Sequence, residues 1–216
     1  MIFYESGKTM SAKERREREK EQRRQQILDA ARELLFEKGL HGATVNQVAK
    51  NAELSVGLIY FYFKSKEEIY ASLQEEGLDL LCTMIRDAAS GSSISSKKLR
   101  NISLAYYRFA HEYKSYFDIL NYFLTAPERI FPENLKSRID MHGDRILSVI
   151  DEVAEEGTQK GELTIENPRE FSIMLWSQIH GYLQLNKLQD TVLKGRDFEK
   201  LFKETVDRFI KSVTSH

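Results

Sequence analysis

The sequence predicts an all-α protein of about nine helices, three in an amino-terminal domain and the others in a larger carboxy-terminal domain. Three observations support this prediction. Proline is scarce, at 3 of 216 residues. The Asn-Gly and Asp-Gly pairs that mark β-hairpins do not occur in the sequence. Apolar residues recur at helical spacing, and the chain is long enough to bury a sizeable core.

The first predicted helix begins near Ser11 and ends at Gly39. Ser11 and Glu14 have the spacing of a capping box, and the residues that follow are rich in helix formers. The buried stripe of this helix is expected to be Ile27, Ala30, Ala31, Leu34 and Leu35. Residues 1–22 form an arm that is either flexible or an extension of the helix. The charged residues 15–24 are either a solvated surface or a contact to neighbouring DNA phosphates.

A helix-turn-helix motif is predicted next. Thr44 and Gln47 form a second capping box, which opens a short helix. The chain breaks at Ala52, and Ser55 is the N-cap of another short helix that ends at Tyr62. Two short helices joined by a tight turn form the motif whose second helix fits the major groove of DNA.

The carboxy-terminal helices follow a third capping box. Ser65 and Glu68 open a long helix that continues to Ala89, with Gly77 as a weak point within it. Residues 90–93 form a linker. Further helices are expected over 96–113, 115–125, 133–156, from Pro168 onward and over 197–213.

Charge is unevenly distributed along the chain. Residues 1–66 contain 13 Lys and Arg against 9 Asp and Glu, whereas the remaining residues contain 19 and 24. A basic amino-terminal part followed by an acidic remainder is typical of a protein with a nucleic-acid-binding domain at that end. Chance would also produce such an asymmetry, so the counts alone leave both interpretations open.

Composition argues against several protein classes. The single cysteine, Cys82, excludes an internal disulfide, and no metal cluster is indicated. No apolar run approaches the roughly 20 residues of a membrane-spanning helix. Residues 1–10 lack the basic start and apolar core of a signal peptide. We therefore expect a soluble, cytoplasmic protein without a membrane partner.

A specific run of residues surrounds the predicted helix-turn-helix. It reads Gly42-Ala43-Thr44, Val48-Ala49, Ala52 to Gly57 and Ile59 to Ile69, and it contains Tyr-Phe-Tyr-Phe-Lys-Ser-Lys-Glu-Glu. The run resembles the DNA-binding signature of the TetR (tetracycline-repressor-like) family of bacterial regulators, and the resemblance covers residues 23–73. Glu53 departs from the pattern because the family usually has glycine in this turn. In a left-handed conformation Glu53 would cost about 1 kcal/mol relative to glycine.

The resemblance implies a homodimer that binds a double-stranded DNA operator. It implies a DNA-binding domain at residues 23–69 and an effector-binding and dimerisation domain at 70–216. Carried over by motif position, the DNA-binding residues are Thr44, Asn46, Ser55, Val56, Gly57, Tyr60, Tyr62 and Lys66. Tyr60, Tyr62 and Lys66 would contact the DNA backbone, although packing within the small domain is the other interpretation for the two tyrosines. Phe61 and Phe63 are assigned to the core.

An aromatic run at residues 106–123 is the candidate binding site for a small, hydrophobic effector. The expected pocket residues are Tyr106, Phe109, Tyr113, Phe117 and Phe123, with Asn121 and His142 as polar anchors. Aromatic residues at helical spacing also form ordinary cores, so this alternative stays open.

The last two helices are the expected dimer interface. The residues assigned to it are Phe171, Leu175, Ile179, Tyr182, Phe202 and Phe209, with small residues nearby that would allow two helices to approach closely. The alternative is an apolar face that packs only within one chain.

The predicted function is that of a DNA-binding transcriptional regulator. The resemblance implies a repressor that leaves a palindromic operator when a hydrophobic molecule binds. The alternative is a DNA-binding protein without a small effector, controlled by a protein partner or acting architecturally. No catalytic residues, cofactor or metal site are expected. The sequence has no Gly-rich phosphate loop, no His-Glu metal helix and no Gly-x-Ser-x-Gly elbow, and its 5 histidines are scattered.

Overall fold

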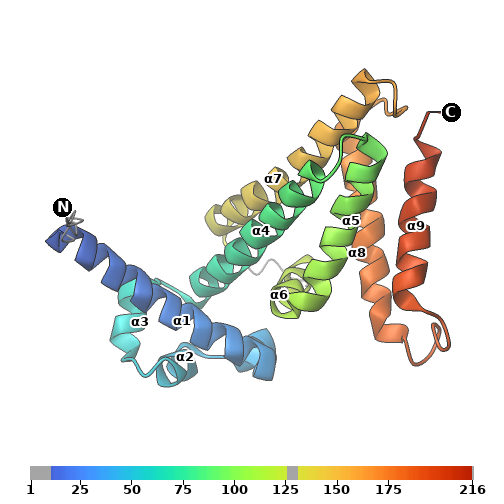
Figure 1. Ribbon diagram of the computed structural model, residues 1–216. Helices are drawn as coiled ribbons and strands as arrows, with labels where there is room; N and C mark the ends of the chain where they lie inside the picture. Colours follow the sequence, from blue (N-terminus) through green and yellow to red (C-terminus); the bar gives the residue numbers. More distant parts are fainter. Residues whose placement is uncertain (1–10, 126–130, 216) are drawn as a thin grey trace, which may run out of the picture. The chain divides into compact units, whose positions relative to one another are not determined.

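The computed structural model describes residues 11–125 and 131–215, without the side chains of residues 39–42. These residues form nine α-helices and one short 3-10 helix, and their only β-type pairing is a bridge between Leu163 and Thr214 (Figure 1). The predicted all-α fold is therefore confirmed. The chain divides into two compact units, which we call the amino-terminal unit (residues 1–72) and the carboxy-terminal unit (residues 73–216).

The amino-terminal unit contains α1 (Ala12–Gly42), α2 (Val45–Asn51), α3 (Val56–Tyr62) and the start of α4 (Lys66–Ser90). The capping box at the start of α1 is confirmed: Glu14 N–H donates to Ser11 Oγ over 3.2 Å, and Ser11 N–H donates to Glu14 Oε2 over 2.7 Å. The described part of the predicted arm, residues 11–22, belongs to this helix, and residues 1–10 lie outside the description.

Helix α1 continues past Gly39, so the predicted end at that residue is wrong. A glycine inside a helix costs only about 1 kcal/mol, which tertiary packing readily offsets. The helix ends at Gly42, because Ala43 is extended and leads into the N-cap of α2 at Thr44. The predicted stripe of α1 is buried, with Ile27 and Ala31 fully enclosed.

Polar side chains of α1 form hydrogen bonds and ring contacts with the other elements of the amino-terminal unit. The Gln26 amide donates to the Ala52 carbonyl over 2.7 Å, which ties α1 to the turn after α2. The Arg24 guanidinium lies 4.5 Å from the centre of the Phe63 ring and donates to Ser72 Oγ over 2.7 Å. A cation over an aromatic face is attractive. Arg24 therefore links α1 both to the end of α3 and to α4.

The turn between α2 and α3 is a Schellman motif with glutamate in the glycine position. Leu54 N–H donates to the Ala49 carbonyl over 2.9 Å, and Glu53 N–H donates to the Lys50 carbonyl over 3.1 Å. This pairing requires a left-handed residue after the helix. Glu53 has a φ of 54°, the only positive φ of a non-glycine residue in the described chain.

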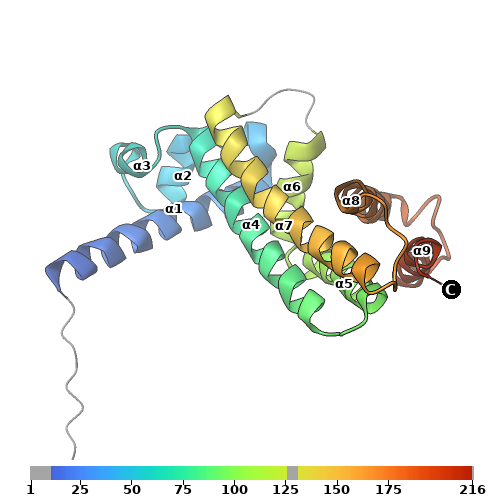
Figure 2. The same cartoon turned by 90° about the horizontal axis from the view of Figure 1, so that it is seen from above.

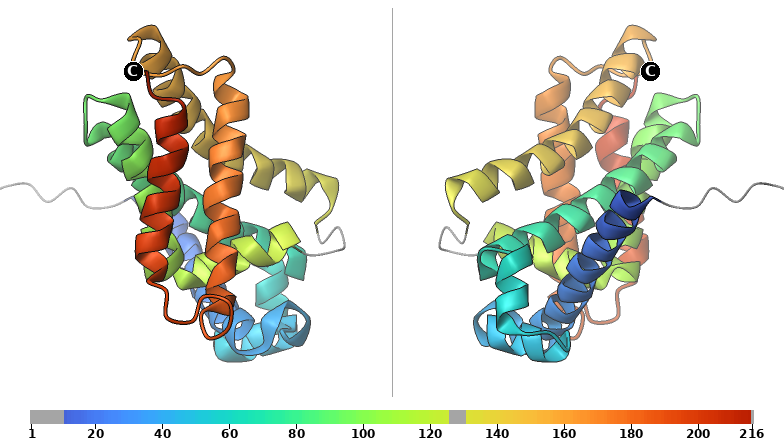
Figure 3. Two further views of the ribbon diagram at one scale, coloured as in Figure 1. Left: turned by 90° about the vertical axis from the view of Figure 1, so that its right-hand side faces the viewer. Right: turned by 90° about the vertical axis from the view of Figure 1, so that its left-hand side faces the viewer.

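The carboxy-terminal unit contains the rest of α4 and five further α-helices, which are α5 (Ser95–Glu112), α6 (Lys114–Thr125), α7 (Glu133–Gln159), α8 (Pro168–Gln184) and α9 (Phe198–Ser212). A 3-10 turn, η1 (Leu185–Leu188), follows α8. Helices α4 and α7 run side by side (Figures 1 and 2) and are joined by an ion pair between Arg138 and Glu75 at 2.8 Å. Helices α8 and α9 also pack along each other (Figure 3).

Gly77 does not interrupt α4, although a glycine was expected to weaken the helix. Its role in the structure is steric. A Cβ atom at this position would lie 2.9 Å from the Cβ and Cδ1 atoms of Tyr116 in α6. The absence of a side chain at residue 77 therefore lets α6 lie close against α4.

Glu53→Gly is expected to raise the free energy of unfolding by about 1 kcal/mol, because glycine adopts a positive φ without the Cβ clash. Urea unfolding of the full chain measures this change. Glu53→Ala is the matched control, since alanine removes the charged side chain but keeps the Cβ atom. An equal gain in the alanine variant would assign the effect to the side chain and contradict the explanation from backbone conformation.

Candidate nucleic-acid interface and internal cavity

Helix α2 begins in a complete capping box. Gln47 N–H donates to Thr44 Oγ1 over 3.3 Å, and Thr44 N–H donates to Gln47 Oε1 over 3.0 Å. Both Thr44 and the neighbouring Asn46 are exposed. The remaining free amides at the start of the helix and the helix dipole would favour an anion here, so this end of α2 suits a phosphate.

Helix α3 presents one open face. Ser55 caps it by accepting from Leu58 N–H over 3.2 Å. Ser55 and Gly57 are exposed, and nothing lies within 4 Å of the position that a Cβ at Gly57 would take. Tyr60 is 50% exposed, whereas Ile59 is fully buried against the rest of the unit. A backbone or a base edge could therefore approach the start of α3 closely.

The assignment of Phe61 to the core is wrong, because its side chain is 74% exposed. The assignment of Phe63 is confirmed, since that side chain is fully buried. Ile59 and Phe63 are four residues apart and share one helical face. Phe61 lies midway between them and points to the opposite side, where its ring meets the half-buried Tyr62 edge-on at 5.2 Å.

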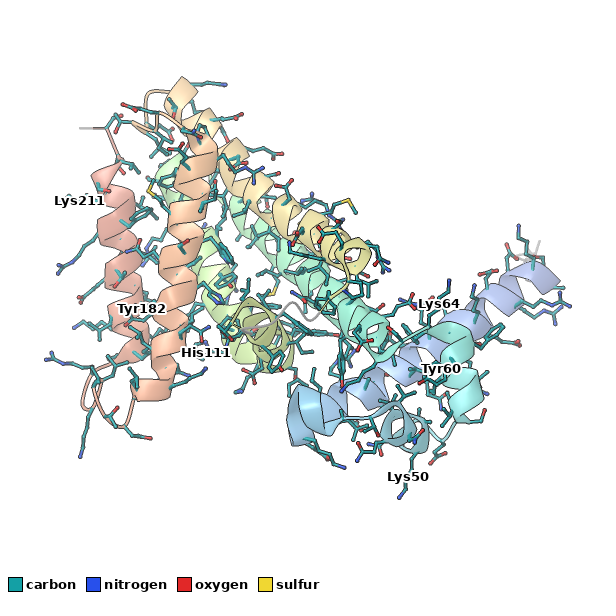
Figure 4. All side chains as sticks on the ribbon, turned by 180° about the vertical axis from the view of Figure 1, so that it is seen from behind. Lys50, Tyr60, Lys64, His111, Tyr182 and Lys211 are labelled. Carbon is teal, nitrogen blue, oxygen red and sulfur yellow. The ribbon has the colours of Figure 1, made fainter. Side chains whose placement is uncertain are left out.

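Two lysines are exposed near α3. Lys50 and Lys64, together with Tyr60 of α3, lie on the surface of the amino-terminal unit (Figure 4). The Lys66 ammonium lies 5.4 Å from the centre of the Tyr70 ring, and partial burial lowers its pKa. Glu68 N–H donates to Ser65 Oγ as predicted, but the Glu68 carboxylate accepts from Lys64 N–H over 2.7 Å rather than from Ser65.

A cavity of about 280 Å³ lies among α4 to α8 of the carboxy-terminal unit and is open to solvent on the side of Leu124, Asp140 and Asp144. Its wall is largely apolar, and it is lined by Gln74, Leu78, Leu81, Tyr106, Leu120, Leu124, Ile139, Asp140, Gly143, Asp144, Ile146, Leu147 and Trp176. A second, smaller cavity of about 150 Å³ is lined by Phe117 and Asn121 among others. The rings of Tyr106 and Phe117, one from each wall, meet edge-on at 6.3 Å.

The seven residues predicted to form a pocket are dispersed. Tyr106 lines the larger cavity, and Phe117 and Asn121 line the smaller one. Phe109 is buried in the core, and Tyr113 is 38% exposed. The Phe123 ring packs on Phe131 at 4.4 Å, and His142 Nδ1 lies 2.7 Å from an Asp79 carboxylate oxygen at the surface.

The α4 side of the larger cavity was missed from the sequence. Gln74, Leu78 and Leu81 follow one another at helical spacing and share one face. Gln74 is a polar residue in an otherwise apolar stripe, and that irregularity is the signal that could have drawn attention to it.

A hydrogen-bonded chain runs behind the cavity wall. Trp176 Nε1–H donates to the Tyr106 hydroxyl over 3.4 Å, and this hydroxyl lies 2.8 Å from His180 Nδ1. Gln184 lies 3.3 Å from the other ring nitrogen of His180. Burial raises the pKa of Tyr106 and lowers the pKa of His180, so both groups are held neutral.

The residues predicted for a dimer interface lie mostly inside the chain. Phe171, Leu175, Ile179 and Phe202 are at most 2% exposed, and Tyr182 and Phe209 are half-buried. These side chains already pack within one chain, and their part in a dimer stays a prediction. The exposed residues of α8 are Glu170, Ile173, Met174, Ser177 and Gly181.

No helix in residues 11–125 and 131–215 combines the length and hydrophobicity of a membrane-spanning segment. Within that same part of the chain, no three His, Cys, Asp or Glu side chains are grouped so as to hold a metal ion.

Two family models match most of the chain. Residues 27–73 match the family described as bacterial regulatory proteins, tetR family, and residues 99–209 match the tetracyclin repressor-like C-terminal domain. Among curated proteins, the fatty acid metabolism regulator protein of Bacillus subtilis is 28% identical over 144 residues, which cover 64% of this chain and 69% of that protein. The transcriptional activator FasR of Mycolicibacterium smegmatis is 30% identical over 111 residues, covering 50% of this chain and 51% of that protein.

Solved structures share the fold. FadR from Bacillus subtilis, in complex with stearoyl-CoA, has a TM-score of 0.73 at 23% identity, covering 86% of this chain and 97% of that one. The fatty acid degradation regulator FadR from Bacillus halodurans has a TM-score of 0.71 at 24% identity, with coverages of 87% and 94%. At these identities the likeness extends to the fold alone.

The half-buried His180 is expected to make the free energy of unfolding depend on pH. Because burial lowers its pKa below the ordinary 6.5, the unfolded chain binds more protons near and below that pH. Its contribution is therefore present above about pH 6.5 and is lost as the pH falls. Urea unfolding at about pH 7.5 and about pH 5.5 should show a smaller difference for His180→Gln than for wild type. His111→Gln, which changes an exposed histidine of the same unit, is the control, and equal effects of the two substitutions would refute the assignment.

Proposed function

Because the chain belongs to the TetR family of bacterial regulatory proteins, we propose that it is a repressor released from a palindromic DNA operator when a hydrophobic molecule binds its carboxy-terminal unit. The observation that carries this proposal is the open face of α3, which a capped α2 and a buried Ile59 hold in place. A largely apolar cavity in the other unit supports the effector part of the proposal.

In this proposal α3 enters the major groove, and its surroundings bind phosphates. Thr44 would present its helix N-terminus to one phosphate, and the Tyr60 hydroxyl and the Lys66 ammonium would bind others. Helix α3 contains no Arg, Asn or Gln. Val56 and Leu58 would contact thymine methyl groups, and DNA shape would supply further discrimination.

We further propose a homodimer with two-fold symmetry. Beyond the exposed Glu170 in the first turn, the open face of α8 is apolar or small, with Ile173 and Met174 at 44% and 53% exposure and with Ser177 and Gly181 beside them. Small residues allow two helices to approach closely, and exposed apolar residues favour burial against a partner. Symmetric dimers bind half-sites about 34–36 Å apart, or a multiple of that distance.

The effector is proposed to carry an aliphatic chain. A relative is named for fatty acid metabolism, and a protein of the same fold was solved with stearoyl-CoA. The wall of the cavity offers leucine and isoleucine side chains for such a chain. Helix α4 begins in the amino-terminal unit and forms part of the wall, so a ligand there can act on DNA binding if it has different affinities for the two states.

Selection of genomic fragments by the purified protein is expected to return a palindromic site. Gel shift on that site should show steep salt dependence, and micromolar stearoyl-CoA or a shorter acyl compound should release the DNA. Weak binding without sequence preference would contradict the regulator proposal. Specific binding that neither an acyl compound nor a neutral aliphatic amide or alcohol releases would instead favour control by a protein partner.

Lys66→Ala is expected to weaken binding to the operator and to random duplexes by the same factor, because a phosphate contact carries no sequence information. The slope of log affinity against log salt should become shallower by about 0.9. Competition binding with both duplexes measures this effect. Lys211→Ala, which removes an exposed lysine from α9, is the matched control. A selective loss of operator preference would contradict the positioning role.

A further inference from the structure

We propose that Gln74 holds the polar group of the effector, and that this group is uncharged and donates a hydrogen bond. The inference deepens the proposed function and rests on its assignment of the larger cavity to the effector. The inference specifies the polar group of the ligand, whereas the proposed function specifies only its aliphatic chain.

Gln74 is one of three buried polar residues of the carboxy-terminal unit whose side-chain oxygen has no partner among the described residues; the other two are Ser95 and Asn121, and neither lines the larger cavity. Its side chain is 6% exposed and lies in the cavity wall, and its Oε1 accepts no hydrogen bond from any described residue. Most buried polar atoms in proteins have a partner, so an unpaired amide beside a cavity calls for one. A ligand with an N–H or O–H group would provide it.

The other polar groups of the wall already have partners. The Tyr106 hydroxyl accepts from Trp176 and is bonded to His180. Asp140 pairs with Lys136, and Asp144 pairs with Arg169 at 3.0 Å. Among the lining residues, Gln74 is therefore the group left to bind a polar atom of the ligand.

The charges of the wall indicate which ligand chemistry fits. The lining residues include two carboxylates, Asp140 and Asp144, and no Lys, Arg or His. A carboxylate head group would find no cation in the wall to pair with, so the loss of its hydration on entering the cavity would not be compensated. A primary amide matches Gln74 in either orientation of the glutamine amide, and an alcohol supplies the donor that Oε1 lacks.

The position of Gln74 gives this contact a route to the DNA-binding unit. Gln74 belongs to α4, the helix that begins in the amino-terminal unit. A hydrogen bond formed only with the ligand would stabilise the state of α4 that permits it. Such a contact changes the balance between states only if it differs between them.

Trp176 provides a direct readout, because it is the only tryptophan in the chain and lines the cavity. Fluorescence titrations of the full chain with octanamide, octan-1-ol, methyl octanoate and octanoate compare ligands with one common chain. Octanamide and octan-1-ol are expected to bind about tenfold more tightly than the ester and the anion. A preference of the wild type for octanoate would overturn the uncharged head group.

Gln74→Met keeps the length of the side chain but removes both hydrogen-bonding atoms. This variant is expected to lose the preference for the amide and the alcohol while binding methyl octanoate within about twofold of wild type. Leu78→Met, on the same face of α4, is the matched control and should keep the preference. Retention of the preference in Gln74→Met would overturn the role of Gln74 and leave the cavity as the effector site. The absence of any Trp176 response in wild type would overturn the cavity assignment as well.

A second measurement needs no ligand. Gln74→Met should raise the Tm of the free protein, because it removes a buried acceptor that has no partner. A lower Tm, with Leu78→Met unchanged, would mean that the amide is already satisfied in the free protein, and it would overturn the inference.

Discussion

Tyr106 is 1% exposed, and the hydroxyl of a tyrosine enclosed to that extent must find hydrogen-bond partners inside the protein. Both of its partners, Trp176 and His180, lie on α8 and are one helical turn apart. The Tyr106 hydroxyl on α5 therefore fixes both the rotation of α8 about its own axis and its position along that axis. In that register α8 turns Phe171, Leu175 and Ile179 into the core and leaves a face of small and apolar residues open. The same register brings the Trp176 indole into the cavity wall.

Local chemistry explains which features could be predicted from the sequence. The N-caps Ser11, Thr44 and Ser55 bond to amides within their own first turn, so three or four residues contain all the information. Pro168 is equally local, since its fixed φ suits the first position of α8. The helix-turn-helix could be predicted because several of these capping residues occur together in one short stretch. The left-handed conformation of Glu53 was suggested only by the family resemblance, in which glycine is usual at this position, and the φ of 54° shows it.

Partners that are remote in the sequence explain the rest. Helical spacing indicates that Phe109, Phe117 and Tyr106 can face inward, but not which of them meets a cavity. The apolar stripe of α8 was assigned to a second protomer, whereas its side chains are enclosed by the same chain. An apolar stripe has the same period in both cases, because packing within one chain and packing against a second protomer require the same kind of residues. Phe61 is a large apolar residue that is exposed. On the seven-residue helix α3 the buried face is formed by Ile59 and the adjoining Phe63, so Phe61, which lies between them in the sequence, faces outward.

The close contact between Gly77 and Tyr116 gives the carboxy-terminal unit a mechanical asymmetry. Interatomic repulsion rises steeply on compression, whereas attraction falls off gently on separation. Because the Tyr116 side chain fills the space that a Cβ at Gly77 would take, a shift of α4 toward α6 would press the backbone of α4 against that ring. In the opposite direction the hydrogen bond from the Tyr116 hydroxyl to Glu76 is the restraint between these two residues. At this level, the contact therefore resists a movement of α4 toward α6 more strongly than a movement of α4 away from α6.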